Sequence, residues 1–184
     1  HDRPPAWLFI FSYLIPAIVL DLTKKHLSLP LRGAFGGGVG MACVCDVVIA
    51  GDDAKFGLTE TRLGLIPATI GPYVIARMGE GRARRVFMSA RVFDAIEAET
   101  LGIVARVVPA DEMDEAVEQE VAPYLSVAPT AVGAAKALAR ALGLRIDTDV
   151  IDATIERLAD TWECDGAIQG ISAFLEKYPA PWTQ

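Results

Sequence analysis

Three consecutive glycines, Gly36 to Gly38, constrain this chain more than any other feature. Residues 33–51 read GAFGGGVGMACVCDVVIAG, in which a bare turn leads into an apolar, helix-like run. From Asp46 onward, the pattern predicts a buried strand over residues 46–51. The stretch matches neither G-x-x-x-x-G-K-[ST] nor a G-x-G-x-x-G that follows a strand, so it is not a familiar phosphate-binding loop.

A helix that begins among glycines exposes unpaired backbone N–H groups and the positive end of its dipole. Without a Cβ, glycine also lets a ligand come close. Such a site suits a carbonyl oxygen that gains negative charge during a reaction. The alternative is that the three glycines only permit tight packing of a helix on a sheet, and the residues alone leave both interpretations open.

Composition and charge set the class. The chain has 184 residues, of which 52% are hydrophobic and 22% charged, as expected for one soluble globular domain. A net charge of −7 argues against binding to nucleic acid. Three cysteines are an odd number, which favours a reducing compartment, and we expect a cytoplasmic protein. Cys43 and Cys45 are predicted to be small core residues, and we expect no metal site.

The one candidate for a membrane segment is AWLFIFSYLIPAIVL, residues 6–20. It is shorter than the ~20 residues that a span needs, and Pro16 interrupts it. No small-residue cleavage site of a signal peptide precedes Asp21. We therefore expect a core strand followed by a helix here, and no membrane partner.

The remaining pattern predicts strands and helices in alternation, then helices alone. A second extended segment is expected over 54–60, and Asp94, Glu97 and Gly102 carry the cap signals of a short helix. In the C-terminal part, Met113, Ala116, Val117, Val121, Tyr124 and Leu125 share one helical face opposite an acidic, solvated one. The other expected elements are helices over 71–79, 81–90, 130–143, 149–162 and 167–178, and a strand over 103–109 that Pro109 ends.

Glu60 is the candidate acid. It stands in FGLTETRLGLIP, residues 56–67, at the end of an extended segment and before a glycine-bearing loop. A carboxylate that is partly buried at such a place would have a raised pKa and could move a proton. An exposed glutamate near a helix start is the alternative interpretation.

These motifs together resemble the enoyl-CoA hydratase/isomerase (crotonase) superfamily from about Leu31 to the C-terminus. The resemblance rests on their order: G-G-G, an apolar helix, Asp, a strand, F-G-x-x-E, L-G-x-x-P, A-x-E-A-x-x-L-G-x-V and A-F-L-E-K. Within the family, the sequence of residues 59–80 is most similar to that of bacterial methylglutaconyl-CoA hydratase-type members. The resemblance implies an α/β fold with a crotonase-like (ClpP/crotonase) β-β-α spiral core and a helical C-terminal region.

By resemblance, Gly37 donates its N–H to a thioester oxygen and Glu60 is the acid/base. The reaction implied is the addition of water to a 2-enoyl-CoA, and coenzyme A is then part of the substrate, with no metal or redox cofactor. Homotrimers or hexamers are common in the family. The substrate-binding residues that the resemblance implies are Phe35, Gly36, Gly38, Pro67, Ala68 and Thr69, with Ile70 also shaping the acyl pocket, and Phe174 and Lys177 at the nucleotide end.

Two departures from the family pattern keep alternatives open. Gly40 stands where the typical hydratase has a first glutamate, so a Δ3,Δ2-enoyl-CoA isomerase or a non-catalytic homologue remains possible. No A-G-A-D-L-like segment, the source of a second oxyanion N–H, occurs in residues 1–30. We expect those residues to be several separate pieces written end to end. Residues 1–110 are accordingly predicted as an incomplete or discontinuous spiral core, and residues 111–184 as a helical oligomerisation region.

Overall fold

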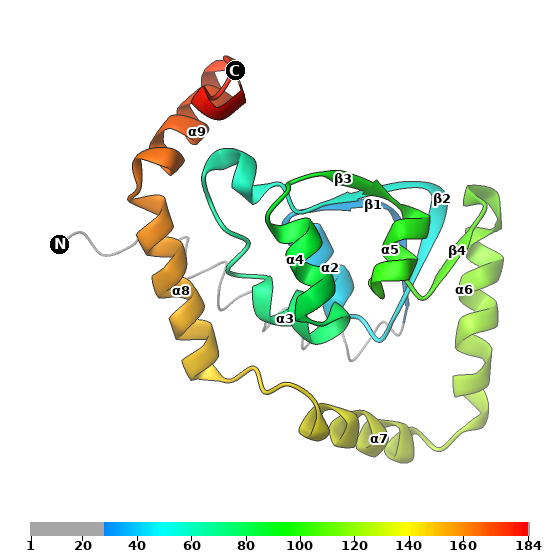
Figure 1. Cartoon of the computed structure of the whole chain (residues 1–184). Helices are drawn as coiled ribbons and strands as arrows, with labels where there is room; N and C mark the ends of the chain where they lie inside the picture. Colours follow the sequence, from blue (N-terminus) through cyan, green and yellow to red (C-terminus); the bar gives the residue numbers. More distant parts are fainter. Residues whose placement is uncertain (1–27, 184) are drawn as a thin grey trace.

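The computed structural model of the chain describes residues 28–183 (Figure 1). Four strands form one sheet around β2 (Val47–Gly57). β1 (Ser28–Phe35) pairs with β2 in parallel on one edge. On the other edge β4 (Arg106–Val108) pairs in parallel and β3 (Val92–Asp94) antiparallel. This mixed, mainly parallel sheet confirms the predicted α/β class.

The two faces of β2 bury different side chains because successive residues of a strand point to opposite sides. Val48, Ala50, Ala54 and Phe56 lie in the main core. This core is shared with α2 (Gly37–Val44), α3 (Gly71–Met78), α4 (Glu80–Phe87) and α5 (Ala95–Leu101).

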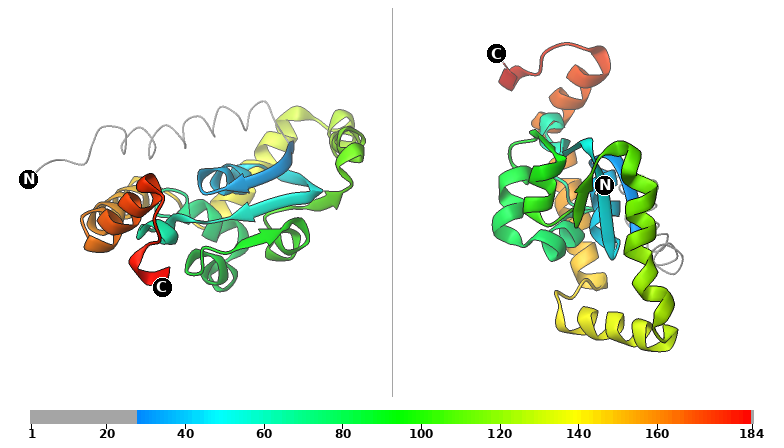
Figure 2. Two further views of the ribbon diagram at one scale, coloured as in Figure 1. Left: turned by 90° about the horizontal axis from the view of Figure 1, so that it is seen from above. Right: turned by 90° about the vertical axis from the view of Figure 1, so that its right-hand side faces the viewer.

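Ile49 faces the other way, into a smaller cluster with Val108 and Ala116. That cluster lies under α6 (Met113–Val121), which covers the opposite face of the sheet, as the view from above in Figure 2 shows. The sheet is therefore covered on both faces, and the strand that leaves α2 runs through the middle of the molecule.

The expected helices over 71–79 and 81–90 are present, the second one ending early at Phe87. The cap signals of α5 are confirmed: Asp94 Oδ1 accepts from the Glu97 N–H at 2.9 Å, and Gly102 adopts the left-handed conformation. The separation into strands over 46–51 and 54–60 is wrong, since β2 is continuous from Val47 to Gly57. β1 and β3 were not predicted.

Beyond the sheet, the helices from α6 onward trace an arc in Figure 1, from the right of the sheet, below it through α7, to α8 and α9 on the left. α8 (Thr148–Trp162) and α9 (Asp165–Glu176) lie against residues 63–68, whereas α7 (Pro129–Leu142) has no buried residue. The short 3-10 segments are Glu60–Leu63 (η1), Ala110–Glu112, Ala122–Ser126 and Pro181–Thr183.

The apolar face expected after residue 110 holds only in its first half. Met113, Ala116 and Val117 pack on the sheet, but the α-helix ends at Val121 and Leu125 is 82% exposed. Pro123 lacks a backbone N–H and does not continue the regular helix, which breaks the periodicity there.

Two predictions concern residues outside the described part of the chain. The strand-and-helix expectation for residues 6–20 lies there entirely. The expectation that residues 1–30 are separate pieces also does, except for residues 28–30, which begin β1.

Candidate active site

The N-terminus of α2 carries the glycine run. Gly36 has φ 49° and ψ −117°, a conformation that favours glycine. Its N–H donates to Gly57 O at 2.9 Å, which ties the turn to the end of β2. Its carbonyl accepts from the N–H groups of Val39 and Gly40 at 3.0 and 3.3 Å. The helix start is therefore held from both sides.

Gly37 and Gly38 form the exposed beginning of the helix. At the first helical positions, backbone N–H groups have no acceptor within the helix. A Cβ built at Gly37 would meet no atom within 4 Å, so the space beside it is open in the described structure. The feature that the sequence suggested, accessible amides at a helix N-terminus, is present.

Glu60 is brought to this turn by β2 and the two residues that follow it. It is the first residue of η1, and a Cβ at Gly36 would stand 3.2 Å from Glu60 Oε1. The carboxyl group therefore lies against the glycine turn, and glycine at position 36 leaves it room. The prediction that Glu60 points into the fold is consistent with its half-buried state.

Burial raises the pKa of Glu60, and a hydrogen bond from its own backbone N–H opposes that change. Glu60 Oε2 is buried with no hydrogen-bond partner among residues 28–183, and so is the neighbouring Thr61 Oγ1. A buried oxygen without a partner is costly, and natural proteins keep such groups mainly where they are used. The arrangement can hold and release a proton beside a row of amide donors.

Gly40, one turn further along α2, faces a different neighbour. A Cβ at this position would stand 2.7 Å from Ile70 Cβ and closer still to Ile70 Cγ2. Real Cβ contacts are not this short. The position of the expected first glutamate is therefore closed by Ile70, whose side chain is 3% exposed.

The segment that follows Glu60 is held by the C-terminal helices. Leu65 and Ala68 share a buried cluster with residues of α8 and α9. The backbones approach closely, because a Cβ at Gly170 of α9 would stand 2.6 Å from Leu63 C. A Cβ at Gly64 would likewise collide with the backbone of Gly166. Two helices far along the sequence thus fix the loop beside the candidate acid.

The structure places the predicted substrate-binding residues in two groups. Phe35, which is 49% exposed, packs its ring beside Gly57, next to the glycine turn. Pro67, Ala68 and Thr69 lie in the loop between η1 and α3, with Pro67 and Ala68 buried. Phe174 and Lys177 lie at the end of α9, exposed to solvent.

The basic residues near α4 have structural partners. Arg77 donates to the carbonyls of Gly102, Cys45 and Asp46 at 3.1 to 3.3 Å. Arg84 pairs with Glu80 on the surface at 3.7 Å. Arg77 therefore joins α3 to the ends of neighbouring elements, and Arg84 lies in a solvated ion pair.

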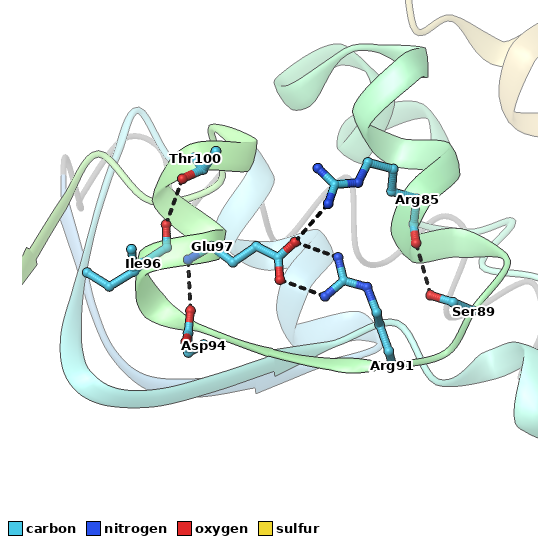
Figure 3. A network of polar contacts seen from close by, with 7 residues as sticks. All are labelled: Arg85, Ser89, Arg91, Asp94, Ile96, Glu97 and Thr100. Carbon is cyan, nitrogen blue, oxygen red and sulfur yellow. Dashed lines mark hydrogen bonds and ion pairs between the residues drawn. The ribbon is translucent and has the colours of Figure 1, made fainter.

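A second polar cluster joins α4, β3 and α5 (Figure 3). Arg91 donates to both carboxylate oxygens of Glu97 at 2.5 and 2.6 Å, and Arg85 approaches the same group at 3.5 Å. The hydrogen bond from Arg91 lowers the pKa of Glu97. Arg91 also lies over the Phe93 ring. The cluster therefore connects α4 and the start of β3 to α5.

Cys43 is buried, as expected for a core residue, and burial raises the pKa of its thiol to about 12. Cys45 is half-buried and donates to Met41 O. Within residues 28–183 there is no group of three or more His, Cys, Asp or Glu side chains that could hold a metal ion. Of the helices in the described part, none is long and apolar enough to cross a membrane.

Sequence reasoning missed two contributions to this site. The close contacts of Gly64 and Gly170 join segments about a hundred residues apart, as their numbers show, and no local pattern reports them. The contact of Ile70 with Gly40 was also missed, because the two residues lie 30 positions apart in the sequence and no local pattern joins them.

Comparisons with known proteins give consistent results. A model of the family described as "Enoyl-CoA hydratase/isomerase" matches residues 31–184. The chain is 32% identical over 154 residues to the "Probable enoyl-CoA hydratase echA8" of Mycobacterium bovis, covering 82% of this chain and 59% of that protein. It is 33% identical to a mitochondrial methylglutaconyl-CoA hydratase of Homo sapiens, covering 92% of this chain and 52% of that protein.

Solved structures show the same fold. An enoyl-CoA hydratase from Mycobacterium avium superposes with a TM-score of 0.77 at 27% identity, covering 96% of this chain and 69% of that one. An enoyl-CoA hydratase from Shewanella pealeana gives a TM-score of 0.67 at 34% identity, with 96% and 66% covered. The chain thus spans little more than half the length of the curated relatives that it matches.

Proposed function

The chain belongs to the enoyl-CoA hydratase/isomerase family, and from that premise we propose that the intact protein adds water across the double bond of a 2-enoyl-CoA thioester. The observation that carries this proposal is the position of Glu60. Its carboxyl group lies against Gly36, at the N-terminus of the helix whose next amides are accessible. A carboxyl group close to accessible backbone amides supports the roles of acid/base and oxyanion donor proposed here.

In the proposed reaction, the Gly37 N–H donates to the thioester oxygen. Charge moves onto that oxygen when water attacks C3, and a preorganised donor stabilises it by about 3 kcal/mol. The helix dipole acts in the same direction. The donor is needed most in the transition state, which is where it accelerates the reaction.

Glu60 handles the proton. As a carboxylate it accepts a proton from the attacking water while the oxygen bonds to C3, and it returns a proton to C2. The product is a 3-hydroxyacyl-CoA, and no atom is left over. Its raised pKa brings the acid closer to working pH, where a group that both takes and gives a proton is most effective.

The test is hydration of crotonyl-CoA, followed at the enoyl-thioester absorbance, by full-length protein and by the Glu60→Gln variant. We expect the variant to lose about 100-fold or more in kcat with its fold intact. Glu156→Gln, an exposed change on α8, is the matched control and keeps full activity. A Glu60→Gln variant as active as the unchanged protein would overturn the assignment.

For the acyl group we propose 3-methylglutaconyl-CoA. Two observations support this choice. The sequence of residues 59–80 resembles methylglutaconyl-CoA hydratase-type members, and the chain is 33% identical to proteins named methylglutaconyl-CoA hydratase. The kcat/KM values for 3-methylglutaconyl-CoA and crotonyl-CoA, measured side by side, test this choice. A higher value for crotonyl-CoA would reject it while leaving the hydratase in place.

A Δ3,Δ2-enoyl-CoA isomerase is the second candidate. One observation favours it: the position of the first family glutamate is Gly40, and Ile70 leaves no room there for another side chain. A single carboxylate suffices to move a proton between C4 and C2. Incubating a 3-enoyl-CoA with the protein and following the appearance of the conjugated thioester distinguishes the two reactions. Inactivity with every enoyl-CoA would favour a non-catalytic homologue.

Further parts of the proposal concern the environment of the protein. Coenzyme A is part of the substrate, and the chemistry needs no metal or redox cofactor. We propose a homotrimer or hexamer formed through residues 111–184, where α7 has no buried residue in the single chain. The three free cysteines support a cytoplasmic location.

A further inference from the structure

The contact between α2 and the loop before α3 is unusually close at one point. Gly40 is buried, and a Cβ there would stand 2.7 Å from Ile70 Cβ and 3.8 Å from Ile70 Cα. The nearest atom is the branch methyl Cγ2. Ile70 therefore fills the space that any side chain at position 40 would occupy. The contact involves both its side chain and its Cα.

Ile70 has little freedom to move away. It is the N-cap residue of α3, and its carbonyl accepts from the N–H groups of Tyr73 and Val74 at 3.1 and 3.0 Å. Its side chain is 3% exposed and belongs to the main core. A β-branched side chain also has few accessible rotamers. A larger residue at position 40 would have to displace the start of α3.

The filled position and the candidate acid both lie at the N-terminal turn of α2. Gly36 is the N-cap residue of α2, and Gly40 lies four residues further on, about 6 Å along the helix axis. The Glu60 carboxyl lies against the first and Ile70 against the second. The glycines at the start of α2 therefore meet one acid and one aliphatic side chain.

We propose that Gly40 and Ile70 form a matched pair which makes this a one-carboxylate site. Ile70 occupies with an apolar side chain the room that a second acid at position 40 would need, so among residues 28–183 Glu60 alone is left to transfer the proton. Ile70 is thus a positioning residue that sets the mechanism by exclusion. This inference rests on the proposed function, because it assigns the acid and base steps to one group.

The first test measures stability and does not depend on activity. Gly40→Glu should lower the Tm of the full-length protein by about 5 °C or more, because the core is overpacked there. Ile70→Gly should also lower it, through the cavity left behind. In Gly40→Glu combined with Ile70→Gly, the loss should be clearly smaller than the sum of the two.

The matched control is Gly81→Glu in α4, where a Cβ meets no atom within 4 Å. Its Tm should stay within about 2 °C of the unchanged protein. If Gly40→Glu alone were as stable as Gly81→Glu, position 40 would have room and the pairing would be refuted. Strictly additive losses in the double variant would refute it as well.

The second test is the pH profile of kcat/KM for enoyl-CoA hydration. The unchanged protein should show one ionisation on the acidic side, and the double variant two, since adjacent carboxylates titrate in two steps. Two ionisations in the unchanged protein would overturn the sole-acid assignment. If it turned over no enoyl-CoA at all, the proposed function would fail, while the stability result would still decide the pairing.

Discussion

At the scale of single residues, the site combines a half-buried acid with an unobstructed glycine. Glu60 Oε2 has no partner among the described residues, and the space beside Gly37 is open. Neither feature helps the chain to fold, because an unsatisfied buried oxygen costs free energy and glycine weakens a helix. Both are suited to a substrate, and each can therefore be separated from stability by mutation.

The first prediction concerns Glu60 and pH. Its pKa is raised above the ordinary value of 4.5, so the folded state holds the proton more tightly than the unfolded state. This favours folding below pH 4.5, and the advantage is lost as pH rises through the folded pKa. Glu60→Gln should therefore raise Tm by about 2–4 °C at pH 8 and have little effect at pH 4.

Thermal unfolding in a series of buffers checks this, with Glu156→Gln as the exposed control. A gain of equal size at pH 4 and pH 8 would show that the ionised carboxylate is not the cause. Buffer ionic strength should be held constant, since it changes the contributions of surface charges.

The second prediction concerns Gly37. Ala at this position meets no atom, so Gly37→Ala should keep or slightly raise Tm, by up to about 1 °C. The new methyl points back toward the helix N-terminus, into the space before the amides. We therefore expect kcat/KM to fall about 100-fold, the usual effect of a substrate displaced by 1 Å.

Gly81→Ala in α4 is the matched control, because its Cβ is also unobstructed. It should change neither Tm nor kcat/KM by much. Full activity in Gly37→Ala would mean that the thioester does not approach this amide.

At the scale of elements, α9 acts as a support for the segment that carries Glu60. The Gly170 backbone lies against Leu63, and Ala167 is buried beside Leu65 and Ala68. Helix-to-backbone packing this close needs glycine, as the short distances show. The C-terminal helices therefore contribute to the site of their own chain.

The third prediction follows from that contact. Gly170→Ala should lower Tm by about 5 °C, since the methyl would stand 2.6 Å from Leu63 C. Gly166→Ala, in the same helix, meets no atom and should stay within about 2 °C. Hydrogen exchange should show lost protection in α8 and α9 for Gly170→Ala alone. Equal Tm values for the two variants would contradict the close packing.

The fourth prediction concerns the Glu97 cluster of Figure 3. Arg91 holds the pKa of Glu97 below its ordinary value, so its stabilising effect is present at neutral pH and is lost as pH falls. Glu97→Gln should lower Tm by about 1–3 °C at pH 7 and by less in high salt. Glu99→Gln, exposed on the same helix, is the control and should show no such loss.

Local signals predicted the elements that carry their own caps. α5 is defined by Asp94 and Gly102, and both positions behave as expected. β3, by contrast, has three residues and exists because Phe93 pairs with Phe56 across the sheet. Its partner strand is distant in the sequence, so no local periodicity predicts the pairing. The same holds for the contact between Ile70 and Gly40, where each residue alone suggests only packing.

At the scale of the whole molecule, α7 is the least integrated helix within residues 28–183. Leu138 and Leu142 are 61% and 80% exposed, and a cavity of about 870 Å³ separates α7 from α3. An ion pair between Lys136 and Asp46 joins it to the rest of the chain. An apolar surface of this kind is typical of a contact with another subunit.

The fifth prediction is that these leucines are covered in the assembled protein. Multi-angle light scattering should give the mass of a trimer or hexamer for the unchanged full-length protein. Leu138→Glu with Leu142→Glu should shift it toward the monomer, because each charge would be buried without a partner. Ile96→Glu, equally exposed on α5, should leave the mass unchanged. An unchanged mass in the double variant would exclude α7 from the contact.

The contact at Gly40 also decides what directed evolution of this protein can find. A saturation library at position 40 alone should return almost only glycine, because Ile70 closes the position to any side chain. A library at position 70 alone can create space beside Gly40, but it supplies no side chain at position 40 to use that space. The two positions must be randomised together, and any stepwise path to a second acid must remove the isoleucine before it adds the glutamate.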